Sequence, residues 1–127
     1  MSRFVRPETR TLTLANGDQL IVRARLTAGE QRAQYARIYR AGADGKLQPD
    51  PLQLGVGVVL AYLLDWNFKD DAGQAVLIRD LSIDELQRVI DALDPDSFKE
   101  IRTAIDAHAD AMAAEREAQK KTDGGTP

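Results

Sequence analysis

Few residues in this 127-residue chain could support catalysis. Cysteine is absent and His108 is the single histidine, which excludes thiolate chemistry and disulfides and leaves mainly carboxylates for a metal site. The carboxylates occur where they cap helices or meet solvent, and no nucleophile–base pair accompanies them. His108 falls at the edge of an apolar helical stripe, a position typical of packing or of a polar bridge. The sequence therefore predicts a non-enzymatic protein without cofactor or metal.

Two local patterns could suggest a ligand loop, but neither is complete. Gly55-Val56-Gly57 begins like a dinucleotide-binding turn, yet Leu60 stands where the third glycine belongs and no phosphate-binding lysine follows. Asp70 and Asp71 form an acidic pair that is too sparse for a calcium loop, which places oxygen ligands at alternate positions over about twelve residues. Both segments are interpreted as structural.

Large aromatic side chains near helix ends are the remaining candidates, because such groups supply much of the energy of protein interfaces. A groove that binds a partner's helix needs large apolar side chains at helical spacing. The same side chains can fill a core with their polar tips hydrogen-bonded, so each residue has both interpretations. The candidate partner-binding residues are Tyr35, Tyr39, Tyr62, Trp66 and Phe98.

Charge is distributed unevenly along the chain. Residues 1–50 carry nine basic and five acidic side chains, whereas residues 51–127 carry eight and fifteen, so the two parts have net charges of +4 and −7. The basic part could favour an acidic partner, or it could pair with the acidic part or face water. Nucleic acid is disfavoured, because no aromatic residues alternate with Arg10, Arg23 and Arg25.

The first elements expected from the sequence are a hairpin and a capped helix. Asn16-Gly17 between two β-prone runs is a strong hairpin signal, which predicts strands over residues 9–15 and 18–25. Thr27 and Glu30 have the spacing of a capping box, which predicts a helix that continues to about Ala41. Residues 42–51 contain glycines and prolines and are expected to form a loop.

The later segments predict three more helices. Residues 52–66 are apolar on all sides, as expected of a buried central helix, with Gly57 and Ala61 spaced to admit another helix closely. Ser82 and Glu85 form a second capping box before a helix to about Leu93. A last helix begins at Pro95 and is expected to continue to about Gln119, its end projecting or frayed.

These elements predict an α+β fold in which an N-terminal β-hairpin packs on about four α-helices, with helix predominating. We expect a flexible arm over residues 1–8, a single domain over 9–118 and a disordered tail over 119–127. The N-terminus lacks the apolar run of a secretion signal, and the central helix is too short to span a membrane. The cytoplasm of a bacterial host is the expected location.

In their order along the chain, several segments resemble the small tail assembly chaperones of long-tailed, siphovirus-like bacteriophages and prophages. The resemblance spans residues 10–108, and no single segment is specific on its own. The segments are a threonine-rich strand with Asn16-Gly17-Asp18, Leu26-Thr27-Ala28-Gly29-Glu30-Gln31, Tyr62-Leu63-Leu64-Asp65-Trp66 with Ile78-Arg79, Leu93-Asp94-Pro95-Asp96-Ser97-Phe98 and Ile105-Asp106-Ala107-His108.

The resemblance implies a protein that acts during tail assembly and is absent from the finished particle. Its partners would be the long, aggregation-prone tape measure protein and also tail tube subunits, and a longer form made by ribosomal slippage is known in such families. The resemblance gives no binding residues to transfer to this chain. Two alternatives stay open: a structural tail subunit that forms homo-oligomers by strand addition, and a small nucleic-acid-binding regulator.

Overall fold

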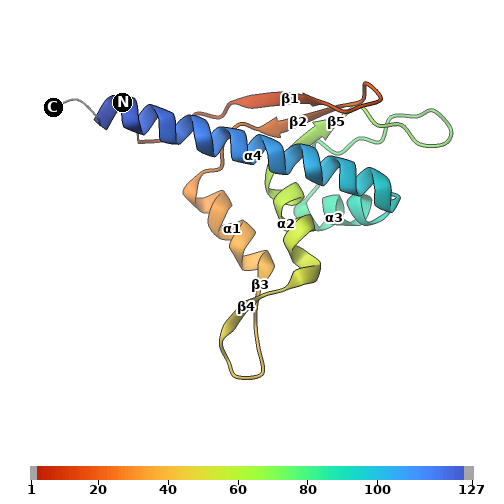
Figure 1. The fold of residues 1–127 in the computed structure, drawn as a ribbon. Helices are drawn as coiled ribbons and strands as arrows, with labels where there is room; N and C mark the ends of the chain where they lie inside the picture. Colours follow the sequence, from red (N-terminus) through yellow and green to blue (C-terminus); the bar gives the residue numbers. More distant parts are fainter. Residues whose placement is uncertain (1–2, 125–127) are drawn as a thin grey trace.

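A computed structural model of the chain describes the backbone of residues 3–124 and the side chains of residues 3–120. It confirms the predicted α+β fold, with an N-terminal hairpin packed on helices and with helix predominating (Figure 1). The helices are α1 Ala28–Ile38, α2 Pro51–Tyr62, α3 Ile83–Asp91 and α4 Pro95–Gly124, and the strands are β1 Thr9–Thr13, β2 Gln19–Arg23, β3 Tyr39–Ala41, β4 Leu47–Pro49 and β5 Leu63–Trp66.

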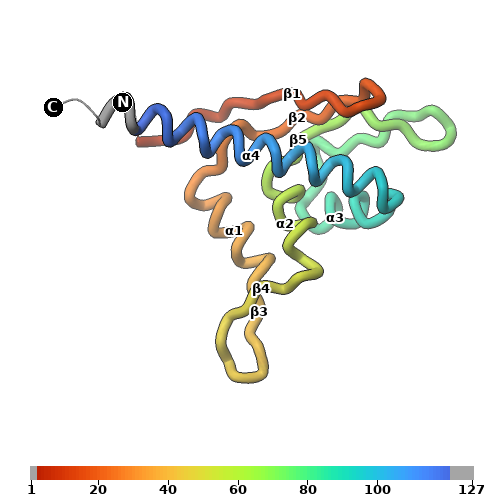
Figure 2. Tube along the Cα trace, in the orientation of Figure 1, coloured from red at the N-terminus to blue at the C-terminus, as the bar shows by residue number. Residues whose placement is uncertain are grey.

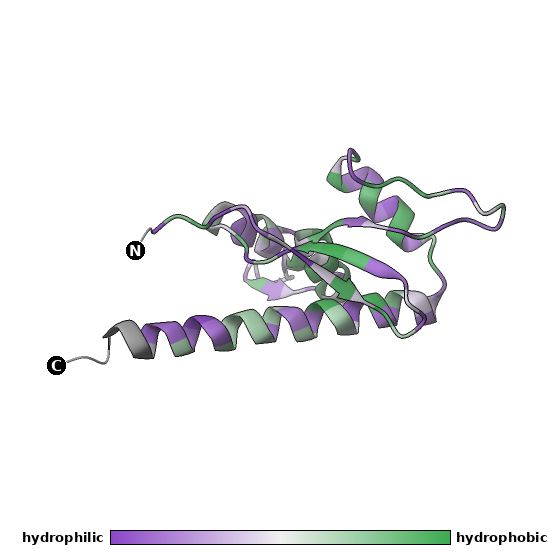
Figure 3. Ribbon diagram, turned by 90° about the horizontal axis from the view of Figure 1, so that it is seen from above, coloured by the Kyte–Doolittle hydropathy of each residue, from purple (hydrophilic) through white to green (hydrophobic). Residues whose placement is uncertain are grey.

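The predicted hairpin is present as β1 and β2, which pair antiparallel and are joined by a turn with Gly17 at a φ of 91°. A positive φ is readily adopted only by glycine, which explains the Asn-Gly signal. The third strand of this sheet is β5, which pairs antiparallel with β2, so the strand order is β1-β2-β5. The helices pack beneath the sheet, and α4 runs along one side of it (Figures 1 and 3).

The expectation that the central helix extends to residue 66 is wrong, because α2 ends at Tyr62 and the chain continues as β5. In β5, Leu63 pairs with Val22 and Trp66 with Leu20, with a register shift between them. This bulge lets Leu63 and Trp66 both face the core, although a regular strand would place residues three apart on opposite faces. The three-residue spacing of these core-facing side chains is therefore also the spacing expected on one face of a helix.

A second correction concerns residues 39–51. Helix α1 has the predicted capping box at Thr27 but ends at Ile38, before the predicted end at Ala41. The predicted last residues of the helix form β3, and the expected loop supplies β4 and the turn of this second hairpin, which includes Gly45 at a φ of 78°. Asp44 and Gly45 supplied a turn signal of the same kind as Asn16-Gly17. The strands are only three residues long, too short for an alternating pattern to be recognised among glycines and prolines that are typical of loops.

The core lies between the sheet and the helices α2, α3 and α4. Helix α2 has more buried residues than any other element, as expected of the central helix. The close approach of another helix at Gly57 is confirmed, because a Cβ there would lie 2.8 Å from Cγ1 of Ile38 on α1. The core side chains that are almost completely buried are Leu20, Val22, Val59, Leu60, Ile101 and Ile105.

Helix α4 continues beyond its predicted end and includes residues 119–124, where a disordered tail was expected. Residues 113–121, which lead into this stretch, are all alanine, glutamate, arginine, glutamine or lysine, which are strong helix formers. The guanidinium of Arg25 holds the helix there, 4.0 Å from the carboxylate of Glu115 and 3.4 Å from the amide oxygen of Gln119. Residues 125–127 of the expected tail lie outside the described residues. Of the expected N-terminal arm, residues 3–8 are exposed and contain neither helix nor strand.

Candidate protein-binding surface

Metal-binding side chains are scattered over the described residues. No group of three or more His, Cys, Asp or Glu side chains is placed to hold a metal ion in this part of the chain. The single histidine has a structural setting: Nε2 of His108 lies 2.9 Å from the carbonyl oxygen of Arg23, and its ring meets Tyr62 edge-on at 5.7 Å. His108 is thus the polar bridge that its position in the sequence predicted.

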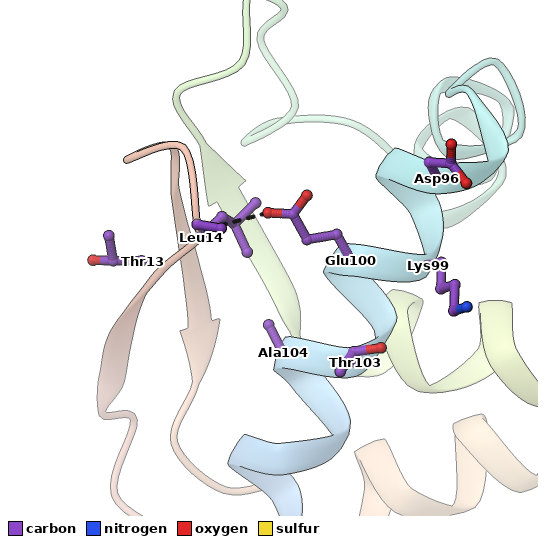
Figure 4. Close-up of a pocket in the computed structure, with 8 residues that line it drawn as sticks. Thr13, Leu14, Asp96, Lys99, Glu100, Thr103 and Ala104 are labelled. Carbon is purple, nitrogen blue, oxygen red and sulfur yellow. Dashed lines mark hydrogen bonds between the residues drawn. The ribbon is translucent and has the colours of Figure 1, made fainter.

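An open depression of about 400 Å³ lies between the turn of the first hairpin and α4 (Figure 4). The backbone N–H of Ala15 donates a hydrogen bond of 3.3 Å to Glu100, which links the turn to the helix. Asp96 and Lys99, which also line the depression, point away from Glu100 in different directions (Figure 4). The polar groups do not converge on one point, so the depression offers no catalytic arrangement.

The structure separates the five predicted partner-binding residues into two groups. Trp66 belongs to the core: its ring stacks on Phe68 at a centroid distance of 4.5 Å, and its indole N–H donates to the carbonyl oxygen of Val76 at 2.8 Å. Tyr62 and Phe98 are half-buried against the same core, and burial raises the pKa of the Tyr62 hydroxyl. Trp66 and Tyr62 serve mainly as packing, while Phe98 packs on the core and also lines a groove.

The other two residues, Tyr35 and Tyr39, are exposed, with 50% and 41% of their surfaces accessible. They lie one helical turn apart at the end of α1, and their rings meet edge-on at 6.0 Å. Aromatic pairs of this geometry are rigid and offer a large apolar area at little cost in side-chain entropy. They are the predicted site residues that the structure brings together on an accessible surface.

These tyrosines belong to a weakly packed limb formed by α1 and the β3–β4 hairpin, residues 28–50. Within it only Ile38 is buried, although every residue of the limb is described. The hairpin projects from the body on the side away from the three-stranded sheet (Figures 1 and 2). A two-stranded hairpin without a packed face is marginally stable in water, so this one would gain stability from a partner.

One face of the projecting hairpin is apolar. Tyr39 pairs with Pro49 and Ala41 with Leu47, and because side chains alternate along a strand, these four side chains share a face. Tyr35 extends the same surface onto α1 through its contact with Tyr39. We call these residues the apolar strip: Tyr35, Tyr39, Ala41, Leu47 and Pro49.

The opposite face of the hairpin is polar and is anchored to the start of α2. It carries Arg40, paired with Gln48, and Nε of Arg40 lies 2.9 Å from the carboxylate of Asp50. Asp50 also caps α2 by accepting the backbone N–H of Leu52. The hairpin is therefore held at its base, while the apolar strip is left to solvent.

Three strip residues were not singled out from the sequence: Ala41, Leu47 and Pro49. Leu47 is the large aliphatic side chain among them, and 72% of its surface is exposed. Leu47 was assigned to a loop, and a single apolar side chain in a loop has no periodic spacing from which its exposure could be predicted. The signal that could have found it is Asp44-Gly45 between Tyr39 and Leu47, because a tight hairpin turn there places the two side chains on one face.

A groove of about 520 Å³ lies beside the base of the limb, where the first turns of α2 meet the end of α3 and the start of α4. Its apolar floor includes Val56, Ile90 and Phe98, and Leu52 stands at its rim with 85% of its surface exposed. Arg102 crosses α2 above Gly55, where a Cβ would lie 3.0 Å from its guanidinium. The groove is thus only partly apolar, because Gln53, Gln87, Asp91 and Arg102 also line it.

No protein-family model, curated protein or solved structure matches the sequence significantly. Among the described residues, no helix combines the length and apolar character needed to cross a membrane.

Proposed function

We propose that this protein is a non-enzymatic tail assembly chaperone that binds the tape measure protein through the apolar strip. The observation that carries the proposal is the limb itself, in which Tyr35, Tyr39 and Leu47 are exposed together on an element with almost no packing of its own. Contiguous exposed apolar side chains often mark interaction sites, because large apolar patches are uncommon on monomeric soluble proteins.

The strip suits an apolar segment of a client. Edge-to-face tyrosines followed by Leu47 present anchors along one line, which an amphipathic helix could match with side chains at three- and four-residue spacing. The free edges of the short hairpin could also accept an extended segment by strand addition. The tape measure protein that the resemblance implies is long and aggregation-prone, so many copies of a small chaperone could cover it. The order of sequence segments across residues 10–108, which resembles tail assembly chaperones, supports this class of client.

The proposal is tested by co-expressing the chain with the tape measure protein of the same phage or prophage. The expected result is a soluble complex with many copies of this protein per tape measure chain, whose mass is measured by light scattering after affinity purification. Tail tube protein added to that complex should then bind, if the protein also recruits tube subunits.

A matched pair of variants separates the strip from general surface effects. Leu47→Asp places a charge in the strip, whereas Leu77→Asp makes the same change at a residue that is 80% exposed and outside the limb. Both variants should fold, and only Leu47→Asp should leave the tape measure protein insoluble. Equal loss or equal retention of the complex in the two variants would contradict a role for the strip. Ordered tubes or rings formed by this protein alone, with the tape measure still insoluble, would favour a structural subunit.

A further inference from the structure

Strand β1 forms an open edge of the three-stranded sheet. The backbone N–H of Leu14 donates to the carbonyl oxygen of Asp18 at 2.7 Å, and the N–H of Ala24 donates to that of Glu8 at 2.9 Å. Because alternate residues of an antiparallel strand bond to the same neighbour, the even-numbered residues of β1 face β2 and the odd-numbered residues face away from it. The residues whose N–H and C=O groups point to the open edge are Thr9, Thr11 and Thr13. Outside the β1–β2 ladder, no backbone hydrogen bond within the described residues uses these groups.

The side chains of β1 make this edge complementary to a second copy of itself. The strand reads Thr-Arg-Thr-Leu-Thr, so an antiparallel second copy centred on Thr11 places Thr9 opposite its Thr13 and Thr11 opposite its Thr11. Outward backbone groups then meet outward backbone groups in all three pairs. Threonine pairs across neighbouring strands are favourable, and Arg10 lies opposite Leu12, so like charges do not meet directly.

The depression between the first turn and α4 adjoins the same edge, since Thr13 and Ala15 line it (Figure 4). In the antiparallel arrangement, Thr9 of the second copy lies opposite Thr13, so its N-terminal arm, residues 3–8, continues along the depression. A chain's own arm leaves β1 at the end opposite to the turn (Figures 1 and 2). Phe4, which is 87% exposed, supplies a large apolar side chain for the depression, whose volume of about 400 Å³ is in the range of natural ligand pockets.

The arm and the depression also have opposite charges. Residues 3–10 carry three arginines and one glutamate, a net charge of +2. The lining of the depression contains Asp96, Glu100 and Lys99, and the adjoining turn adds Asp18, so this end of the molecule has a net charge of −2. None of these side chains takes part in an ion pair within the described residues. Antiparallel pairing therefore brings a basic arm to an acidic turn at both ends of the contact.

We propose that two copies of this chain pair their β1 strands antiparallel about Thr11, and that the arm of each copy lies in the depression of the other. The two sheets join into one, with three strands from each copy. Because each copy offers the same strand, the contact has two-fold symmetry and closes as a dimer.

The dimer goes beyond the proposed function, because it concerns the protein without its client. The limb projects on the side away from the three-stranded sheet, so the apolar strips of both copies stay accessible (Figures 1 and 2). A dimer then presents two strips to one tape measure chain, and two linked sites raise the apparent affinity without any new contact. This consequence alone rests on the proposed function.

Single cysteines test the register of the pairing, because the chain has no cysteine of its own. Thr11→Cys should form a disulfide-linked dimer on mild oxidation, since paired Cα atoms about 5.5 Å apart suit a disulfide. Thr9→Cys is the matched control: the two copies of residue 9 are separated by four residues along the strands, about 14 Å, and should cross-link at least about tenfold more slowly. A mixture of Thr9→Cys and Thr13→Cys should cross-link with each other. Absence of cross-linking in Thr11→Cys, or equal cross-linking in Thr9→Cys and Thr11→Cys, overturns the proposal.

A charge exchange at the two-fold axis tests the pairing without a covalent bond. Thr11→Lys and Thr11→Glu each place like charges opposite one another, which destabilises a strand pair. Sedimentation over a range of concentrations should show dimers about tenfold weaker for each variant, which corresponds to about 1.4 kcal/mol. An equimolar mixture of the two should recover association, while Leu77→Lys and Leu77→Glu, at a residue 80% exposed outside β1, should dimerise like the wild type. A wild type that remains monomeric to about 1 mM, or a mixture that associates no better than its components, overturns the dimer.

The contact of the arm is tested by Phe4→Ser, with Leu77→Ser as its control. Phe4→Ser should weaken the dimer about tenfold, because a buried phenylalanine side chain is exposed again, and about 0.5 M salt should weaken the wild-type dimer by screening the arm. A dimer that ignores Phe4→Ser overturns the placement of the arm. Protection of the β1 amides from hydrogen exchange only when a client is bound assigns the edge to the client and overturns the second copy. Leu47→Asp, which tests the proposed function, should dimerise like the wild type, so the two proposals fail separately.

Discussion

The substitution Gly57→Ala should weaken the attachment of the limb to the body. Gly57 is buried in α2 at the point where α1 crosses it, and a Cβ there would lie 2.8 Å from Cγ1 and 3.1 Å from Cδ1 of Ile38. Side chains do not approach so closely, so Ile38, the buried residue of the limb, must move. Inserting a methyl group into such a contact costs about 1–3 kcal/mol.

Gly55→Ala in the same helix is the matched control. A Cβ at Gly55 would also make close contacts, at 3.0–3.1 Å, but with the guanidinium and Cδ of Arg102, a half-exposed side chain that can rotate away. Both substitutions gain the same helix propensity, about 1 kcal/mol for alanine over glycine. That gain cancels in the comparison, so Gly57→Ala should be less stable than Gly55→Ala by about 1–3 kcal/mol.

The assay is equilibrium denaturation of both variants, combined with hydrogen–deuterium exchange of the α1 amides. Gly57→Ala should lower the free energy of unfolding relative to Gly55→Ala and accelerate exchange in residues 28–38. Adding Ile38→Ala should make the Gly57→Ala change favourable, because the new methyl group then fills space that Ile38 occupied. Equal stability of Gly55→Ala and Gly57→Ala would refute the close approach of α1 to α2.

Three further predictions follow from single contacts. His108→Phe keeps a ring in place but leaves the carbonyl oxygen of Arg23 without this hydrogen bond, and denaturation should show a loss of about 1–3 kcal/mol. Leu63→Ala should cost about 2–5 kcal/mol, because this buried β5 side chain packs in the core; a stable variant that loses partner binding would instead place it at an interface. Burial alone would raise the pKa of Glu30, but hydrogen bonds from Thr27 and the charge of Arg23, 2.6 Å away, lower it below its ordinary value of 4.5. The resulting stability is present above that value and lost as the pH falls through the lowered pKa, so acid should destabilise the wild type more than Glu30→Gln in thermal melts.

The elements that local chemistry specifies were predictable from the sequence. Asn16-Gly17 located the first hairpin and Thr27 located the start of α1, because a turn or a cap depends on a few adjacent residues. The strand β5 was not predictable in this way: the bulge places Leu63 and Trp66 on one face, so their spacing resembled a helix until the pairing with β2 was known. Tertiary pairing decided the conformation of that segment.

The residues of the candidate surface also divide into those that local sequence identifies and those that depend on strand pairing. Tyr35 and Tyr39 could be named from the sequence because their aromatic character and helical spacing are local properties. Leu47 could not, since its exposure and its position opposite Ala41 depend on the pairing of β3 with β4. Trp66, named with the tyrosines, is core because its strand lies against the helices, which no local pattern indicates.

The most direct test of the central claim is a hydrogen–deuterium exchange comparison of free and tape-measure-bound protein. Binding through the apolar strip predicts that exchange slows in the amides of residues 35–49 and changes little in β1, β2 and α4. Protection confined to the three-stranded sheet or to α4, with the hairpin exchanging as fast as in the free protein, would contradict the account.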